Sequence, residues 1–174
     1  MPPRHPVHYK LKACSIFRDF DDRELAALLE LAEPTTYPVG AAIVRQGEVG
    51  SAMFLIADGC ADVSMEAEGC DDVRLSTLGA GDFFGELALV DHEPRSATVT
   101  VKIECTALKV SIGLLRMFAA ESPGAAFKLT MALLEVVGRR LRVANRKYLE
   151  TLSIVAALSA EGTIMLPEND QVVV

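Results

Sequence analysis

A short segment at residues 83–99, FFGELALVDHEPRSATV, combines the residue types that bind an anion. Gly85 precedes a run of good helix formers, and the first N–H groups of a helical turn lack internal partners and favour negative charge. Arg95 follows nine residues after Glu86, and its planar guanidinium can meet more than one phosphate oxygen at once. Ser96 adds a hydroxyl donor. The spacing therefore predicts a phosphate site.

Glu86 indicates what kind of phosphate compound this site takes. A carboxylate repels a phosphate, so Glu86 fits the site only if it accepts hydrogen bonds from another group, such as a sugar hydroxyl. Glu86 alone, or Arg95 alone, is more often a solvated surface charge, but their joint placement around a glycine turn favours binding. An anion, a donor hydroxyl and an apolar wall together describe a nucleotide.

Composition and charge narrow the classes of protein. The chain has 174 residues, 51% of them hydrophobic, and a net charge of −7, which disfavours a surface that is basic as a whole and binds nucleic acid or anionic lipid. Neither a signal peptide nor a long uninterrupted apolar segment is present. We therefore expect one cytoplasmic domain that has no membrane partner.

Metal chemistry finds little support in the sequence. The cysteines form no C-x-x-C pair, and the histidines are not spaced as metal ligands. We therefore expect reduced thiols, no metal, and no metal-dependent enzyme of the cupin type, which shares the barrel shape. The residues concerned are Cys14, Cys60, Cys70, Cys105, His5, His8 and His92.

Changes in hydrophobic period divide the chain into parts. Residues 1–34 have helical spacing and predict one or two helices, whereas residues 35–112 alternate between apolar and polar positions and contain regular glycine turns. This texture, which includes alternation through Val99, Val101 and Ile103, predicts a small antiparallel barrel or jelly roll. Residues 113–152 return to helical spacing, with a short helix near Ile112 to Glu121 and a long helix from about Pro123 to Leu152. Residues 153–174 form a tail.

The long helix carries an apolar seam and a basic cluster. The seam follows steps of three and four, so it can either face a second copy of the helix or cover the barrel of its own chain. We favour a homodimer, because a helix of about thirty residues is longer than a small barrel. The basic cluster is either a nucleic-acid stripe or a solvated helix face. The seam comprises Phe127, Leu134, Val137, Leu141, Ala144, Tyr148 and Thr151, and the cluster Arg139, Arg140, Arg142, Arg146 and Lys147.

The pattern FGELAL, followed after a short insertion by PRSATV, resembles the phosphate-binding cassette of cyclic nucleotide-binding domains. Such domains occur in the bacterial catabolite activator and in regulatory subunits of cAMP-dependent protein kinase. The glycine-punctuated residues 39–59 also resemble the first half of that family's β-roll. The resemblance implies a mainly β fold, an antiparallel double-stranded β-roll (jelly roll) with N-terminal helices and a long C-terminal helix.

The resemblance also implies roles for individual residues. Glu86 would accept from the ribose 2′-hydroxyl, and Arg95 would pair with the cyclic phosphate. The remainder of the phosphate cradle would comprise Gly85, Leu87, Ala88, Ser96 and Ala97. On the long helix, Asn145 would bond the adenine edge, although a solvated Asn145 is an equal alternative, and Arg140 would reach Glu86 as an ion pair. Ala144 departs from the hydroxyl residue expected there, which puts base selectivity in doubt. Ser96 after the arginine fits a cAMP site, which favours cAMP over cGMP, but its hydroxyl could also meet the guanine amino group of cGMP.

The function expected from these features is a non-enzymatic regulatory module that binds a cyclic nucleotide and signals by reorienting its C-terminal helix. Two alternatives stay open: an interaction or dimerisation domain that binds no ligand, and a regulatory fragment of a larger transcription factor, channel or enzyme. Only 25 residues follow Leu149, which is too few for a helix-turn-helix domain. We therefore expect no direct DNA binding, and the sequence does not identify a protein partner.

Overall fold

The structure, a computed structural model, describes residues 7–32, 34–67, 70–91 and 93–160. The chain divides into two compact units, residues 1–133 and 134–174. The elements, in chain order, are α1 (His8–Lys12), η1 (Ser15–Phe17), α2 (Asp22–Glu30), β1 (Pro34–Tyr37), β2 (Ala42–Val44), β3 (Ala52–Ala67), β4 (Cys70–Gly79), β5 (Phe83–Phe84), η2 (Leu87–Leu89), β6 (Thr98–Ser111), α3 (Ile112–Glu121) and α4 (Pro123–Ala160).

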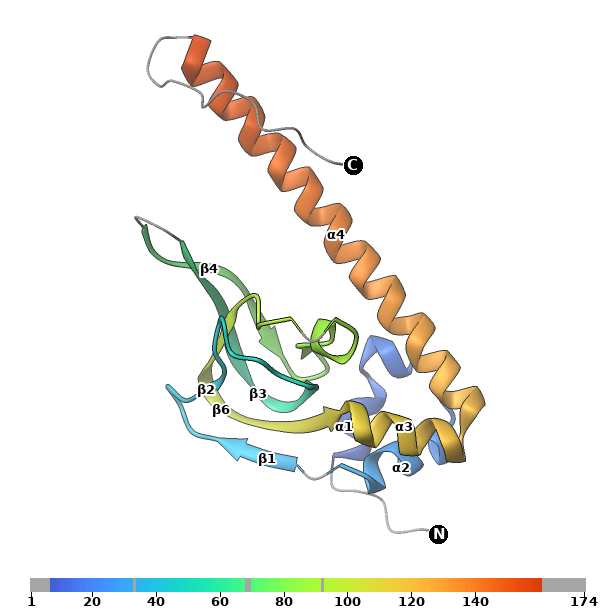
Figure 1. Ribbon diagram of the computed structural model, residues 1–174. Helices are drawn as coiled ribbons and strands as arrows, with labels where there is room; N and C mark the ends of the chain where they lie inside the picture. The colour runs from blue at the N-terminus through green and yellow to red at the C-terminus, as the bar shows by residue number, and fades with distance from the viewer. Residues whose placement is uncertain (1–6, 33, 68–69, 92, 161–174) are drawn as a thin grey trace. The chain divides into compact units, whose positions relative to one another are not determined.

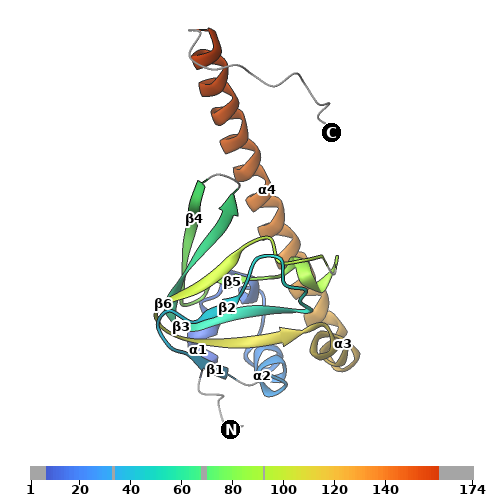
Figure 2. The same ribbon diagram turned by 60° about the vertical axis from the view of Figure 1, so that its left-hand side comes forward.

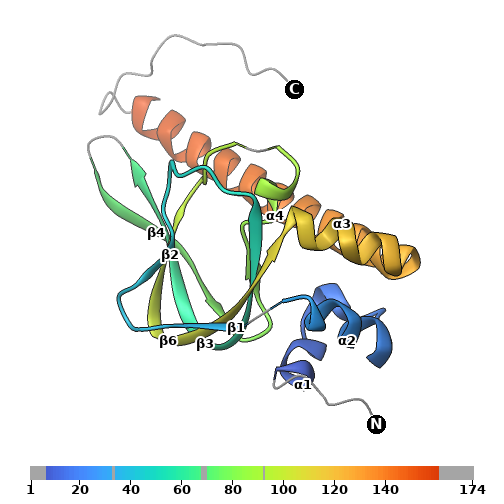
Figure 3. The same ribbon diagram turned by 60° about the horizontal axis from the view of Figure 1, so that its bottom comes forward.

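The six strands form one antiparallel sheet that curves around its own interior (Figures 2 and 3). The strand order is β1-β6-β3-β4, with β2 paired to β6 and β5 paired to β3. The two longest strands, β3 and β6, pair with each other and hold the shorter ones. The predicted antiparallel β-roll with flanking helices is therefore confirmed.

The interior of the roll is filled by side chains that point inward from opposite parts of the sheet. The rings of Phe54 on β3 and Phe84 on β5 stack, with their centroids 5.3 Å apart. This contact anchors the short strand β5 just before Gly85. The buried cluster comprises Val44, Phe54, Ile56, Ala61, Phe84, Val99, Val101, Cys105 and Ala107.

The helices α1, α2 and α3 gather beside one end of the roll (Figure 1). Their packing includes a run of aromatic contacts, because the ring of Phe20 lies 5.2 Å from that of Phe17 and 6.3 Å from that of Phe118 on α3. Phe17 and Phe118 are fully buried. The N-terminal segment and α3 therefore share a core of their own, next to that of the roll.

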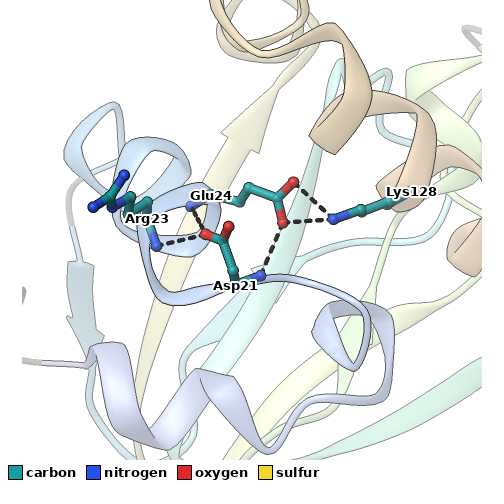
Figure 4. A network of polar contacts seen from close by, with 4 residues as sticks. All are labelled: Asp21, Arg23, Glu24 and Lys128. Atoms are coloured by element: carbon teal, nitrogen blue, oxygen red, sulfur yellow. Dashed lines mark hydrogen bonds and ion pairs between the residues drawn. The ribbon is translucent and has the colours of Figure 1, made fainter.

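A polar network links α2 to the first turns of α4 (Figure 4). The Asp21 side chain accepts hydrogen bonds from the backbone N–H groups of Arg23 and Glu24, and the Glu24 side chain accepts from the Asp21 N–H, all at 2.8 Å. This capping box fixes where α2 begins. Lys128 Nζ also donates to both carboxylate oxygens of Glu24, at 2.8 and 2.9 Å. The start of α4 is thereby tied to the N-terminal helices.

The predicted helices agree with the structure except at the end of the long helix. The N-terminal segment contains a 3₁₀ turn, Ser15–Phe17, as well as two helices. The predicted end of the long helix at Leu152 was wrong, since α4 continues to Ala160. The physical reason is that residues 153–160 include neither glycine nor proline and contain several good helix formers. The predicted short helix Ile112–Glu121 is confirmed.

The expected alternation on β6 fails at Ile103, which is 61% exposed although Val99 and Val101 are buried. The register of β3 against β6 shifts around Gly59, so that Gly59 alone lies opposite two residues of β6. Gly59 has φ +78°, and a Cβ there would lie 1.9 Å from the carbonyl oxygen of Glu104. The bulge thus needs a glycine. A second shift leaves Lys102 unpaired between Val101 and Ile103, so the alternation on β6 is interrupted on both sides of Ile103.

We predict that Gly59→Ala strongly destabilises the fold, because the methyl group collides with backbone that cannot move aside. Gly40 is a matched control, since its φ is +83° but a Cβ there meets nothing within 4 Å. Urea unfolding should show a loss of about 1 kcal/mol for Gly40→Ala, from backbone strain alone, and at least about 2 kcal/mol more for Gly59→Ala. Equal losses for the two variants would contradict the close approach at Gly59.

Candidate functional site

The glycine turn at the centre of the candidate site connects β5 to η2. Gly85 has φ +74°, a left-handed conformation that side chains rarely adopt, and it ends a strand whose two phenylalanines are buried. A 3₁₀ turn, Leu87–Leu89, follows it. The sequence predicted a helical turn directly after Gly85, and this prediction is confirmed. The pairing of β5 with β3 holds the turn in place.

The backbone of Arg95 is held by the loop between β2 and β3. The Arg95 N–H donates to the carbonyl of Glu48, and the Gly47 N–H donates to the carbonyl of Arg95, both at 2.9 Å. Val49 and Pro94 form an antiparallel bridge beside them. The residues before β6 are therefore paired to a loop distant in sequence, and this pairing sets where the Arg95 side chain starts.

The Arg95 guanidinium points inward and reaches the glycine turn. Its Nη1 donates to the carbonyl of Gly85 at 3.1 Å, and its Nη2 donates to the carbonyl of Ala52 at 2.7 Å. Its Cζ lies 5.9 Å from the centre of the Phe54 ring, within range of a cation–π contact. A guanidinium has more N–H groups than these two bonds use, so Arg95 keeps donors for an anion.

The Arg95 guanidinium is partly buried and lies near the carboxylates of Glu48 and Glu86. Burial lowers the pKa of its guanidinium, and the carboxylates of Glu48 and Glu86 act in the opposite direction. An arginine remains protonated in either case. Glu86 is only 8% exposed and is the one buried charged residue in the described part of the chain. The site therefore holds a partly buried cation with a buried carboxylate nearby.

The other predicted site residues fall into two groups. Leu87, Ala88, Ser96 and Ala97 lie in the segments that carry the Gly85 turn and Arg95; Ala88 is buried, Ala97 is half-buried, and Leu87 and Ser96 are exposed.

Arg140 and Asn145 belong instead to the second unit of the chain, on α4, and their side chains are exposed. Their predicted contacts with the base and with Glu86 stay predictions.

Sequence reasoning missed the partners that hold Arg95. The carbonyl of Ala52 carries no sequence signal, because any residue has a carbonyl. Phe54 was recognised only as part of the glycine-punctuated half of the roll, and not as a wall of the site. Glu48 stands before Val49 and Gly50 in a loop whose sequence gives no sign of a contact with Arg95. Only the pairing of this loop with Pro94 and Arg95 reveals its role.

The described ranges contain neither a candidate metal site nor a candidate membrane span. No cluster of three or more His, Cys, Asp or Glu side chains there is arranged to hold a metal ion. Nor does any helix of that part combine the length and apolar character needed to span a membrane. Cys14, Cys60 and Cys105 are free thiols, and burial raises the pKa of Cys14 to about 11. His5 and His92 lie outside the described residues.

A curved antiparallel roll with an inward arginine at a glycine turn is the arrangement that the sequence predicted for the candidate site. Residues 34–122, just over half of the chain, match the family described as cyclic nucleotide-binding domain. The chain belongs to the cyclic nucleotide-binding domain family. The matched range contains the whole roll together with Gly85, Glu86 and Arg95.

Individual relatives agree with this family. Over 135 residues, the chain is 29% identical to a CRP-like cAMP-activated global transcriptional regulator of Mycobacterium tuberculosis. This match covers 78% of the chain and 58% of that protein. It is 38% identical over 93 residues to a cAMP-dependent protein kinase regulatory subunit of Dictyostelium discoideum, covering 52% of the chain and 28% of that protein. The chain thus spans between a quarter and three fifths of these relatives.

Among solved structures, the Thermus thermophilus catabolite activator protein superposes with a TM-score of 0.72 at 27% identity. The match covers 80% of this chain and 63% of the other. The chain is therefore similar in both sequence and fold to a regulator of the type that its cassette resembles.

Proposed function

We propose that this chain binds cAMP at the Gly85 turn and acts as a non-enzymatic regulatory module. The observation that carries the proposal is the convergence of the Arg95 guanidinium, the Gly85 turn and the buried Glu86 carboxylate on one part of the roll. Family membership supports a cyclic nucleotide as the ligand, and the identity of that nucleotide is our inference.

In this proposal the cyclic phosphate takes up the donors that Arg95 does not use. The guanidinium is already partly desolvated, so an incoming phosphate adds charge-assisted hydrogen bonds with little further loss of water. The backbone N–H groups at the start of the Leu87–Leu89 turn and the Ser96 hydroxyl complete the cradle. A phosphate also balances a cation that now relies on Glu48, Glu86 and two carbonyls.

Glu86 serves the ribose in this proposal. A carboxylate accepts hydrogen bonds through several lone pairs, and the 2′-hydroxyl of a cyclic nucleotide is a donor. The Phe54 and Phe84 rings and the buried Ala88 next to the turn supply apolar surface for the rest of the ligand. Glu86 is thereby selective for ribose over deoxyribose, while Arg95 is selective for the phosphate.

The preference for cAMP over cGMP has two supports. The Mycobacterium relative is described as cAMP-activated and the Dictyostelium relative as cAMP-dependent. Within the chain, Asn145 on α4 offers an amide donor and acceptor that suit the adenine edge. In the proposal, Arg140 on the same helix pairs with Glu86 once the nucleotide is bound.

In this proposal, the bound nucleotide signals by reorienting α4. We further propose that α4 packs against the same helix of a second copy of the chain. In the second unit, Leu134, Leu141 and Tyr148 are spaced by seven residues and are 63%, 60% and 53% exposed. Residues at this spacing lie on one helix face, as in a two-helix seam. A ligand signals only if it binds one arrangement of α4 better than another.

One alternative is an interaction domain that binds no nucleotide, and it predicts that cAMP and cGMP leave the thermal stability of the chain unchanged. A true receptor gains about 2.7 kcal/mol of apparent stability at a hundredfold excess of ligand over its Kd.

The other alternative, a regulatory part of a larger protein, is supported by the relatives, of which the chain spans only a part. A cytoplasmic location fits the free thiols.

We predict that Arg95→Ala weakens cAMP binding at least about tenfold, because charge-assisted hydrogen bonds to the phosphate are lost. Arg95→Lys keeps the charge but loses the planar fork, so its affinity should fall in between. Arg116→Ala removes an equal charge at an exposed position of α3 and is the matched control. Isothermal titration calorimetry gives each Kd. Equal affinities of Arg95→Ala and Arg116→Ala would remove Arg95 from the site.

We predict that Glu86→Gln lowers the affinity for cAMP about tenfold but changes the affinity for 2′-deoxy-cAMP much less, because the deoxy ligand lacks the hydroxyl that Glu86 accepts from. Titration of both ligands into both proteins separates this role from a general loss of structure. If the substitution weakens the two ligands equally, Glu86 acts elsewhere than on the 2′-hydroxyl.

We predict that Leu141→Glu shifts the protein from dimer to monomer in multi-angle light scattering, because it places a charge in the proposed seam. Val143→Glu is the matched control, since Val143 is 50% exposed and two residues further along the helix, on the opposite face. A wild-type protein that is monomeric at high concentration, or an equal effect of the two variants, would rule out dimerisation through this seam.

A further inference from the structure

Gly50 stands in the loop before β3, and its backbone does not explain why a glycine is there. The glycines with positive φ in the described residues are Gly40, Gly47, Gly59, Gly81 and Gly85, and Gly50 is not among them. A residue with a side chain can therefore adopt its backbone conformation. The reason for a glycine at this position must lie in the space around it.

That space is occupied by the Arg95 side chain. A Cβ on Gly50 would lie 2.5 Å from Nη2, 2.6 Å from Nε and 2.7 Å from Cζ of Arg95, all far closer than a normal contact. Three atoms of the Arg95 guanidinium group therefore crowd the place that a side chain on residue 50 would take.

The remaining nitrogen of the same guanidinium, Nη1, contacts the Gly85 turn. A Cβ on Gly85 would lie 2.4 Å from Nη1 of Arg95, and Nη1 donates to the Gly85 carbonyl. The loop at Gly47 and Glu48 fixes the Arg95 backbone, while Gly50 leaves room for the far end of its side chain. The guanidinium thus occupies a slot between two glycines that lie in loops distant in sequence.

We propose that Gly50 is a positioning residue for the anion site: the absence of a side chain at residue 50 lets the Arg95 guanidinium lie where the cyclic phosphate binds. This role rests on the proposed function of Arg95. The chemistry involved is spatial, since Gly50 itself touches the arginine and not the nucleotide. The size of residue 50 then sets the affinity for a cyclic phosphate.

The proposal separates binding from stability. In Gly50→Ala the new methyl group meets only the end of a long flexible side chain, which can turn aside at little cost to the fold. The displaced guanidinium gives up its bonds to the Gly85 and Ala52 carbonyls and no longer points at the phosphate. We expect cAMP affinity to fall about tenfold, as for the loss of one charge-assisted hydrogen bond, with little change in the urea unfolding midpoint.

A double-mutant cycle tests the mechanism in the full chain. Affinity for cAMP is measured by calorimetry for the wild type, Gly50→Ala, Arg95→Ala and the double variant. If Gly50 acts through Arg95, the methyl group has nothing to displace in the Arg95→Ala background, and the double variant binds like Arg95→Ala alone. Gly79→Ala is the control, since Gly79 lacks a positive φ and a Cβ there meets nothing within 4 Å.

The outcomes distinguish this inference from the proposed function. Loss of affinity in Gly50→Ala but not in Gly79→Ala, together with the non-additive cycle, supports the role of Gly50. If the wild type binds cAMP and Arg95→Ala does not, yet Gly50→Ala binds as well as the wild type, the inference is wrong and the proposed function stands. Additive losses overturn it as well. If the wild type binds neither cAMP nor cGMP, the proposed function fails and the role of Gly50 fails with it.

Discussion

The candidate site depends on keeping a charged guanidinium partly buried inside a small β-roll. Burial of a cation is unfavourable unless polar groups replace the lost water. For Arg95 the replacements come from β3 and the loops around it: the carbonyls of Ala52 and Gly85, the Phe54 ring, and the carboxylates of Glu48 and Glu86. These groups are far apart in sequence and can meet only in the completed fold.

The strands and loops of the roll bring these groups together. Strand β3 supplies a carbonyl at its start and a ring two residues later, and it also pairs with β5, which carries the Gly85 turn. The backbone of Arg95 is paired to the loop that enters β3. In our proposal, an anion bound at Arg95 acts on β3, β5 and the start of β6 together. A site of this kind binds and positions a ligand, which suits the regulatory role of the family.

Much of the fold follows from local patterns in the sequence. Alternating residues and glycine turns predicted the roll. The ends of α3 were predicted from the return of helical spacing and from Pro123, which opens the next helix, and the structure adds a Ser111 cap at its start. Two features were not predicted, for different reasons. Ile103 faces outward in a stretch of β6 where the register against β3 shifts on both sides of it, and such shifts depend on pairing through space. The end of α4 was placed too early, although residues 153–160 contain no helix breaker. Likewise, the residue types at Gly85, Glu86 and Arg95 suggested an anion site, but the Ala52 carbonyl and the slot at Gly50 have no sequence signature.

The central claim is that the Arg95 guanidinium and the Gly85 turn bind the same phosphate. A titration of the ¹⁵N-labelled protein with cAMP, followed through the Arg95 Nε–H and Gly85 amide resonances, tests this claim most directly. Our account predicts that both resonances shift and saturate at the same ligand concentration. It is contradicted if cAMP saturates the protein, as other resonances report, while these two signals stay in place, or if no resonance responds to cAMP.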